Sequence, residues 1–187
     1  MGTSPRVRVF YDYLDTDTWT DFVTSMVNHF KDRVKYWELW NEPDQWWCWN
    51  GGQDLIAIMM REGAKAVKTA DPTAVVVSGG YANGAAGNLA TIYNTIGNSW
   101  FDVIAWHPYL FDNRPPDTIN WGPGRTNGEG RGLMVQHGDE SKGVFFGELA
   151  SASGVLGAGG GMNDRKQLEY GGRMLLWSRK LGWVNGI

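Results

Sequence analysis

Two glutamates in this sequence each end a run of residues that is typical of a buried strand. Glu42 lies near the end of Tyr36–Pro43, and Glu148 ends Gly143–Glu148. Such a carboxylate is costly to remove from water unless it has a partner or a use. Two carboxylates at one edge suit glycoside hydrolysis, in which one acid protonates the leaving oxygen and the other attacks the sugar or activates water. Glu42 and Glu148 are therefore candidate catalytic acids, and a surface or helix-capping role is the alternative for each.

Other polar side chains also follow predicted strands. Asn41 directly precedes the first candidate acid, and His107 and Tyr109 follow the apolar run 102–106. A histidine and a tyrosine at such an edge could hydrogen-bond a carboxylate and set its protonation state. The alternative for His107 is a structural histidine. Asp12 follows an earlier predicted strand, and a solvated loop acid is the favoured interpretation there.

Tryptophan is unusually frequent, with 11 residues, and three of them cluster just after Glu42. Flat apolar rings with one polar edge suit the faces of sugars. Trp46, Trp47 and Trp49 are therefore predicted to lie beside the substrate. The alternative is a satellite hydrophobic cluster beneath a loop.

Strands and amphipathic helices alternate in the predicted element order, which favours a parallel sheet with helices outside. The first helix is expected to begin at a capping box formed by Thr18 and Asp21. The second should end near Ala70, because Asp71 precedes a proline. Predicted strands are 6–13, 34–40, 74–78, 102–107, 143–148 and 183–187; predicted helices are 19–30, 56–70, 89–96, 131–136 and 163–180.

Two α/β architectures fit this pattern, a doubly wound open sheet and a (β/α)₈ TIM barrel. No glycine-rich phosphate loop follows a strand, which argues against nucleotide binding. Functional residues at the carboxyl ends of several strands favour the barrel. About six strands are found, whereas a barrel has eight and typically ~250 residues. We therefore expect one partial barrel domain over residues 1–187.

Composition narrows the possible partners. The net charge is −3 and no basic run stands out, which argues against nucleic acid and anionic membranes. Cys48 is the lone cysteine, so no intrachain disulfide can form. Cysteine usage therefore does not indicate in which cellular compartment the protein works. The three histidines lack metal-ligand spacing, and neither a metal nor a cofactor is expected. Residues 1–5 lack the apolar core of a signal peptide, and no run is long enough to span a membrane.

Three of these segments resemble motifs of a known enzyme group. Trp37–Pro43 resembles the fourth-strand motif of the clan A glycoside hydrolases, which are retaining (β/α)₈ enzymes. Ala105–Tyr109 is similar to their sixth-strand motif, and Phe146–Leu149 to the strand that carries the nucleophile. Family 39, with β-xylosidases and α-iduronidases, is most similar, and family 5 is next. The resemblance runs from the third strand to the start of the eighth.

The resemblance implies that Glu42 is the acid/base and Glu148 the nucleophile of a retaining β-glycosidase. It also implies that Asn41 binds the sugar 2-hydroxyl and that His107 and Tyr109 support the acids. Gly147 and Ala150 depart from the threonine and glycine that the family usually has there. Counterparts of the family's first two strands are missing, and its eighth-strand tryptophan would fall beyond Ile187.

Several alternatives stay open at this point. The chain could be a fragment, or a second copy or another chain could complete the barrel as an oligomer, because unpaired edge strands tend to pair. A catalytically inactive carbohydrate-binding or scaffold protein on the same framework is the main alternative to an enzyme. An unrelated α/β hydrolase ranks low, because no Gly-x-Ser-x-Gly elbow is present.

Overall fold

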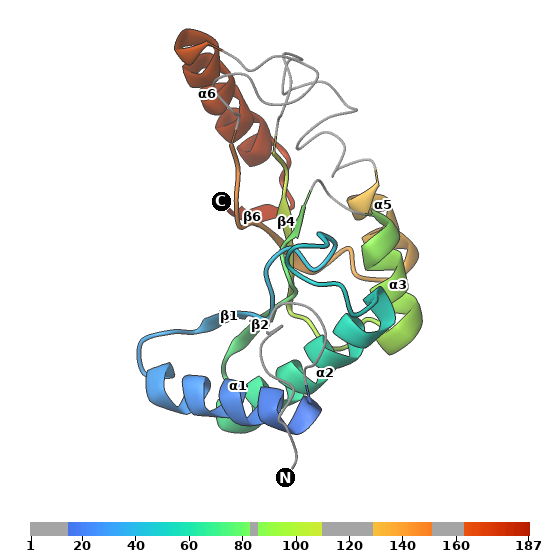
Figure 1. Cartoon of the computed structure of the whole chain (residues 1–187). Helices are drawn as coiled ribbons and strands as arrows, with labels where there is room; N and C mark the ends of the chain where they lie inside the picture. Colours follow the sequence, from blue (N-terminus) through green and yellow to red (C-terminus); the bar gives the residue numbers. More distant parts are fainter. Residues whose placement is uncertain (1–14, 83–85, 110–128, 151–162) are drawn as a thin grey trace.

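The computed structural model describes residues 15–82, 86–109, 129–150 and 163–187. The strand expected at 6–13, and Asp12 with it, lies outside these residues. In Figure 1, α1 and α6 lie at opposite ends of the molecule, and α2, α3 and α5 lie between them.

All strand pairings are parallel, as the alternating pattern predicts. The six-stranded sheet has the order β1-β2-β4-β5-β6, and β3 pairs with the end of β4. This is the order in which a barrel adds strands along the chain, with a helix between successive neighbours. The strands are β1 (Tyr36–Glu38), β2 (Val75–Val77), β3 (Tyr81–Ala82), β4 (Val103–His107), β5 (Gly143–Phe146) and β6 (Val184–Gly186).

Four of the described helices pack side by side, and α6 lies apart from them (Figure 1). α1 contacts α2, α2 contacts α3, and α3 contacts α5 (Figure 1). From α2 onward each helix forms part of the connection between two successive strands, which is the crossover that parallel strands need. The helices are α1 (Thr16–Phe30), α2 (Gln53–Ala70), α3 (Ala86–Ile96), α5 (Gly130–Gln136) and α6 (Asp164–Lys180).

The two faces of the sheet bury different side chains, because successive residues of a strand point to opposite faces. Val76, Ile104 and Val144 belong to the main core with the helices. Val77, Val103 and Ala105 form a separate cluster on the other, inner face. β4 is buried along its whole length. Its last residue, His107, continues the inner series two residues after Ala105.

An exposed ion pair ties the other end of the strands together. Lys68 at the end of α2 lies 2.7 Å from Asp102 just before β4. The same Asp102 oxygen accepts the N–H of Val76 in β2, at 2.8 Å. One carboxylate thus joins a helix end to two neighbouring strands.

The helix limits test the predicted capping signals. α2 ends at Ala70, and Asp71 has extended backbone angles (φ −146°, ψ 97°), as the following proline predicts. The expected capping box at Thr18 is wrong, because α1 begins earlier. Asp15 is its N-cap and accepts the N–H of Asp17 at 3.1 Å and the Thr18 hydroxyl at 3.2 Å.

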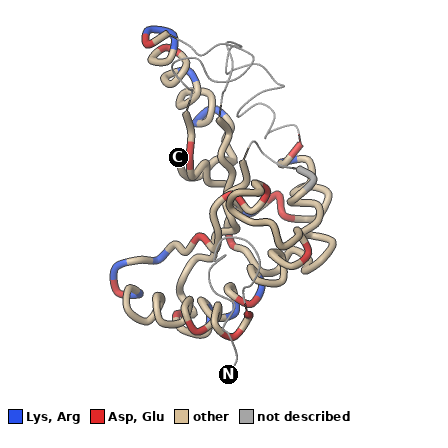
Figure 2. Tube along the Cα trace, viewed as in Figure 1, with Lys and Arg blue, Asp and Glu red and all other residues tan. Residues whose placement is uncertain are grey.

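β3 was not predicted, because two residues are too few to show an alternating pattern. Its Ala82 N–H donates to Asp44 Oδ1 at 3.0 Å, which fastens the loop after β1 to the sheet. Figure 2 shows acidic and basic residues interspersed along the described chain, without a concentrated basic stretch. Among the described helices, none has the length and apolar character needed to cross a membrane.

Two glycines give a matched test of this backbone. Gly172 lies inside α6 and a Cβ there would meet no atom within 4 Å, so Gly172→Ala should stabilise the protein by about 0.5–1 kcal/mol. Gly97 has the same free space but a φ of +74° after α3. Gly97→Ala should therefore destabilise by about 1–2 kcal/mol. Urea unfolding measures the change in the free energy of unfolding for both variants. Changes of the same sign would contradict the assigned helix limits.

Candidate active site

Glu42 is held in an uncommon backbone conformation after β1. Its N–H donates to the carbonyl of Gly80 at 2.8 Å, and Asn41 forms a parallel bridge with the same glycine. Its φ of 42° is the one positive value among the described residues other than glycine. Such a conformation costs about 1–3 kcal/mol and persists where the surroundings enforce it, often at functional sites. The Glu42 side chain is only 15% exposed.

His107 brings the two candidate acids together. Its side chain, at the carboxyl end of β4, is 2% exposed. Its Nδ1 lies 3.1 Å from Glu42 Oε1 and 3.7 Å from Glu148 Oε1. The three ligand atoms of Glu42, His107 and Glu148 all lie within 4.8 Å of one another. The residues that the sequence predicted from separate strand ends therefore converge on one point.

Tyr109 contacts the second acid. Its O–H donates to Glu148 Oε2 at 2.5 Å, and this hydrogen bond to the Glu148 carboxylate raises the pKa of Tyr109 to about 12. The Tyr109 N–H donates to the carbonyl of His107 at 2.9 Å, so a tight turn through Pro108 directs both side chains to the acids. At neutral pH the phenol stays protonated and acts as a donor.

The remaining predicted residues belong to the loop after β1. Asn41 is exposed, and its amide contacts Cys48 Sγ at 3.8 Å. Trp46 and Trp47 form an edge-to-face pair with 5.7 Å between ring centroids, and they are 70% and 48% exposed. Both present apolar rings to solvent, as a sugar-stacking surface requires.

Trp49 departs from the expectation that it lines the substrate. It is 5% exposed and packs edge-to-face on Trp40, with centroids 5.6 Å apart. Its Nε1–H donates to the carbonyl of Gly52 at 2.8 Å, so its polar edge is satisfied inside the fold. For this tryptophan the alternative of a hydrophobic cluster beneath the loop fits the structure.

Sequence reasoning missed a third carboxylate at this site. Glu38 Oε1 lies 3.9 Å from His107 Nε2 and accepts the N–H of Gly80 at 3.1 Å. Burial raises the pKa of Glu38 above its ordinary value. The sequence holds a clue to this placement, because Glu38 lies two residues after Tyr36 and so points to the same face of the strand. In the structure Tyr36 packs on Phe145 of the inner face.

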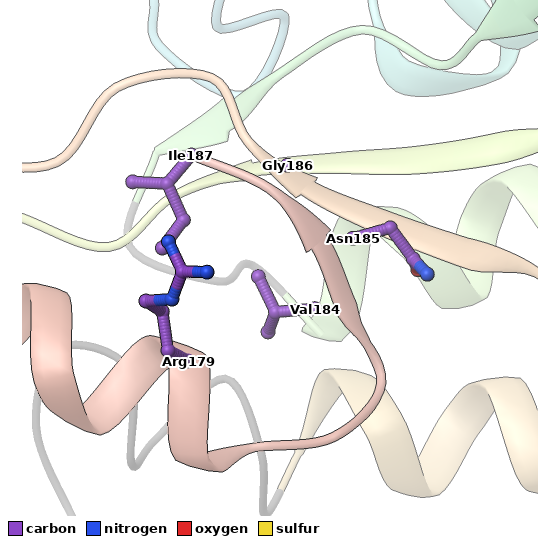
Figure 3. Close-up of a pocket in the computed structure, with 5 residues that line it drawn as sticks. All are labelled: Arg179, Val184, Asn185, Gly186 and Ile187. Carbon is purple, nitrogen blue, oxygen red and sulfur yellow. The ribbon is translucent and has the colours of Figure 1, made fainter.

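A metal ion could be held by the same three groups, Glu42, His107 and Glu148. Their present contacts suit proton chemistry equally well, because a tyrosine hydroxyl donates to Glu148 and an imidazole faces Glu42. A separate cavity of about 240 Å³ lies between α6 and β6. Figure 3 shows the residues that line it, among them Arg179 from α6 and Val184 from β6. Its described lining residues include neither an aspartate nor a glutamate, so it lacks the paired acidic side chains that hydrolysis needs.

The structure resembles solved structures whose sequences differ widely from this one. A glucosidase from Croceicoccus marinus is 18% identical over 94% of this chain and 38% of its own, with a TM-score of 0.74. A family 39 glycoside hydrolase from the gut symbiont Bacteroides cellulosilyticus WH2 is 19% identical over 97% and 38%, with a TM-score of 0.71. A monomeric β-xylosidase from Caulobacter crescentus is 19% identical over 95% and 39%, with a TM-score of 0.68.

The chain folds as part of a (β/α)₈ barrel. At identities below 20% these likenesses show the fold, and the barrels concerned are glycoside hydrolases. The chain spans about two-fifths of the length of these proteins. No protein-family model matches the sequence, and neither does a curated protein.

The contact between Tyr109 and Glu148 predicts a pH effect. Glu148→Gln removes the charge that holds the phenol proton, so the pKa of Tyr109 should fall from about 12 toward ~10. The raised pKa also means that this contact stabilises the fold fully below pH ~10 and is lost as pH rises to about 12. NMR of ¹³Cζ-labelled tyrosine, assigned with Tyr109→Phe, measures the midpoint.

Glu62→Gln is the control for that titration, because Glu62 pairs with Arg61 and Lys65 on α2. It should leave the Tyr109 midpoint unchanged. An unchanged midpoint in Glu148→Gln as well would show that the hydrogen bond does not exist in solution.

Proposed function

We propose that this chain is the catalytic part of a retaining β-glycosidase that resembles family 39 enzymes. One observation carries the proposal: Glu42 and Glu148 follow two strands of one parallel sheet, β1 and β5, and have carboxylate oxygens within 4.8 Å of each other. In retaining glycosidases the two carboxyl groups lie about 5–5.5 Å apart, whereas inverting enzymes need ~6.5–9.5 Å to admit a water. The short separation therefore favours retention.

The two acids take different roles in this proposal. A Glu148 oxygen attacks the anomeric carbon while the bond to the leaving oxygen breaks, and protonated Glu42 gives its proton to that oxygen. Water then attacks the anomeric carbon, Glu42 takes the water proton, and Glu148 is released as a carboxylate. The net reaction exchanges one glycosidic C–O bond for a C–O bond to water.

The neighbouring side chains fit these roles. Tyr109 stays a neutral donor at working pH and directs one oxygen of Glu148, which leaves Oε1 for attack. His107 Nδ1 is within hydrogen-bond distance of Glu42 Oε1, so it can share the proton that Glu42 must give and take back. Their placement supports Glu148 as nucleophile and Glu42 as acid/base.

The substrate class in this proposal is β-linked glycosides or polysaccharides. The exposed pair Trp46 and Trp47 supplies apolar rings on the loop that also carries Asn41 and Glu42. Asn41 is assigned to the sugar 2-hydroxyl on the strength of the motif. The likeness to a glucosidase and a β-xylosidase supports a glycosidase site, with a family 5-like enzyme as the alternative.

The rest of the barrel is part of the same proposal. Within the described residues, β1 and β6 each pair with a single strand and so form the two edges of the sheet. Further chain, a second copy or another protein would close the barrel around the acids. A closed barrel excludes water and strengthens the electrostatic contacts of the site.

Two substitutions separate the proposed roles. Glu42→Gln should reduce hydrolysis of an alkyl β-glycoside by roughly 10²–10⁴-fold, because the leaving oxygen then receives no proton. A nitrophenyl glycoside needs little protonation, so its cleavage should be affected much less. Glu148→Gln should abolish hydrolysis of both. Rates are measured on both substrates, and proton NMR of the first product should show the β anomer.

Glu62→Gln is the matched control and should behave as the unmodified protein. Turnover that survives Glu148→Gln would contradict the mechanism. Sugar binding by calorimetry without turnover of any glycoside would instead support the alternative of a catalytically inactive carbohydrate-binding protein.

A further inference from the structure

Glu38 occupies the inner face of the sheet at the carboxyl end of β1. Tyr36, two residues earlier, packs against Phe145 of the inner cluster with ring centroids 5.4 Å apart. Alternation along the strand therefore directs Glu38 to the same side as His107, which ends the inner series of β4. The Glu38 side chain is 35% exposed, and its Oε1 accepts the N–H of Gly80 at 3.1 Å.

The imidazole of His107 has a carboxylate at each ring nitrogen. Glu42 Oε1 lies 3.1 Å from Nδ1, and Glu38 Oε1 lies 3.9 Å from Nε2. Because the ring is 98% buried, its remaining surface faces protein. A proton on either ring nitrogen therefore has an acidic partner, and each carboxylate acts on the other through the ring.

Two glycines leave the space for this arrangement. A Cβ on Gly80 would lie 2.8 Å from Glu38 Oε1 and closer still to His107 Nε2. A Cβ on Gly147 would lie 3.3 Å from Glu38 Oε2 and 3.3 Å from His107 Nε2. A side chain at Gly80 would therefore displace the imidazole or the carboxylate, whereas one at Gly147 would only crowd them.

We propose that Glu38 is a positioning residue that holds His107 from its Nε2 side and so directs Nδ1 to the acid/base Glu42. The inference rests on the proposed function and deepens it. A negative charge at Nε2 favours a proton on that nitrogen. Nδ1 is then left to exchange a proton with Glu42, as a general acid that alternates between two protonation states requires.

The electrostatics of Glu38 agree with this geometry. Burial raises the pKa of Glu38, the charge of His107 opposes that rise, and the charge of Glu148 adds to it. Glu38 is thus coupled to the histidine by attraction and to the nucleophile by repulsion. Coupling between titrating groups is mutual, so Glu38 acts on both in return.

A purely structural role for Glu38 would be to accept the Gly80 N–H. Glu38→Gln distinguishes the two roles, because its amide oxygen can still accept that hydrogen bond while the charge is lost. The contact between Glu38 and His107 is electrostatic at 3.9 Å. Losing a partner that orients a functional histidine typically costs about 10–100-fold, and we expect a loss of that order here.

The first test does not need turnover. Glutamate is labelled at ¹³Cδ in the full chain, the Glu38 signal is assigned by its loss in Glu38→Gln, and its titration is followed by NMR. The pKa of Glu38 should rise further in His107→Asn, which removes an attraction, and fall in Glu148→Gln, which removes a repulsion. Glu62→Gln should leave it unchanged.

A Glu38 midpoint that moves in neither variant would overturn the proposal. If His107→Asn does not fold, the activity and pH profile of Glu38→Gln carry the test, because Glu148→Gln reports only the repulsion from Glu148. A response of Glu38 in a chain that hydrolyses no glycoside would support the pairing with His107 and overturn the proposed function.

The second test uses activity. Glu38→Gln should lower kcat on an alkyl β-glycoside by about 10–100-fold with little change in KM. Its pH–activity profile should move to lower pH, because neighbouring acids ionise more readily once a negative charge is lost. Glu38→Asp, which keeps the charge, should restore part of the rate. An unshifted profile with full activity in Glu38→Gln would reduce Glu38 to a backbone partner of Gly80.

Discussion

The buried imidazole of His107 is the contact on which the rest of the site depends. It ends β4, the strand that is buried along its whole length, and its Nδ1 faces Glu42 at 3.1 Å and Glu148 at 3.7 Å. A parallel sheet gathers the carboxyl ends of its strands at one edge, so acids that are distant in the sequence meet there. His107 turns that general convergence into a specific contact between two carboxylates.

This contact imposes conditions on the surrounding backbone. Glu42 must adopt a positive φ for its side chain to reach the ring, and the hydrogen bond from its N–H to Gly80 holds it there. Gly80 must remain without a side chain where the backbone passes the imidazole, because a Cβ there would overlap His107 Nε2. Gly147 is where this sequence departs from the threonine usual in the clan A motif that it resembles. A Cβ at Gly147 would lie 3.3 Å from both Glu38 Oε2 and His107 Nε2, a tight contact that glycine avoids.

Much of this arrangement could be predicted from the sequence, because the relevant signals are local. Asp71 before a proline correctly marked the end of α2, and continuous apolar runs correctly marked β2, β4 and β5. Alternating strands and helices favoured a partial barrel, which the sheet order confirms. The start of α1 was predicted wrongly, because Asp15 and Thr18 can both act as N-cap residues. Only the structure shows that Asp15 accepts the capping hydrogen bond.

The site was less predictable where contacts between distant segments determine the burial or the role of a residue. Trp46, Trp47 and Trp49 look alike in sequence, yet Trp49 is buried because Trp40 and the Gly52 carbonyl lie within its reach. Glu38 carried a usable signal in its strand parity, but its meaning depends on His107, 69 residues later in the chain. The roles of Glu42 and Glu148 stay predictions that rest on motif and geometry together.

A covalent glycosyl-enzyme intermediate is the most direct consequence of the proposed mechanism. Incubation with an activated 2-deoxy-2-fluoro-β-glycoside, followed by proteolysis and mass spectrometry, would capture it, because the fluorine slows breakdown of the intermediate. The account predicts a single sugar attached to the peptide that contains Glu148, and no label in Glu148→Gln. A sugar attached at another residue, or a chain that binds the reagent and gains no label, would contradict it.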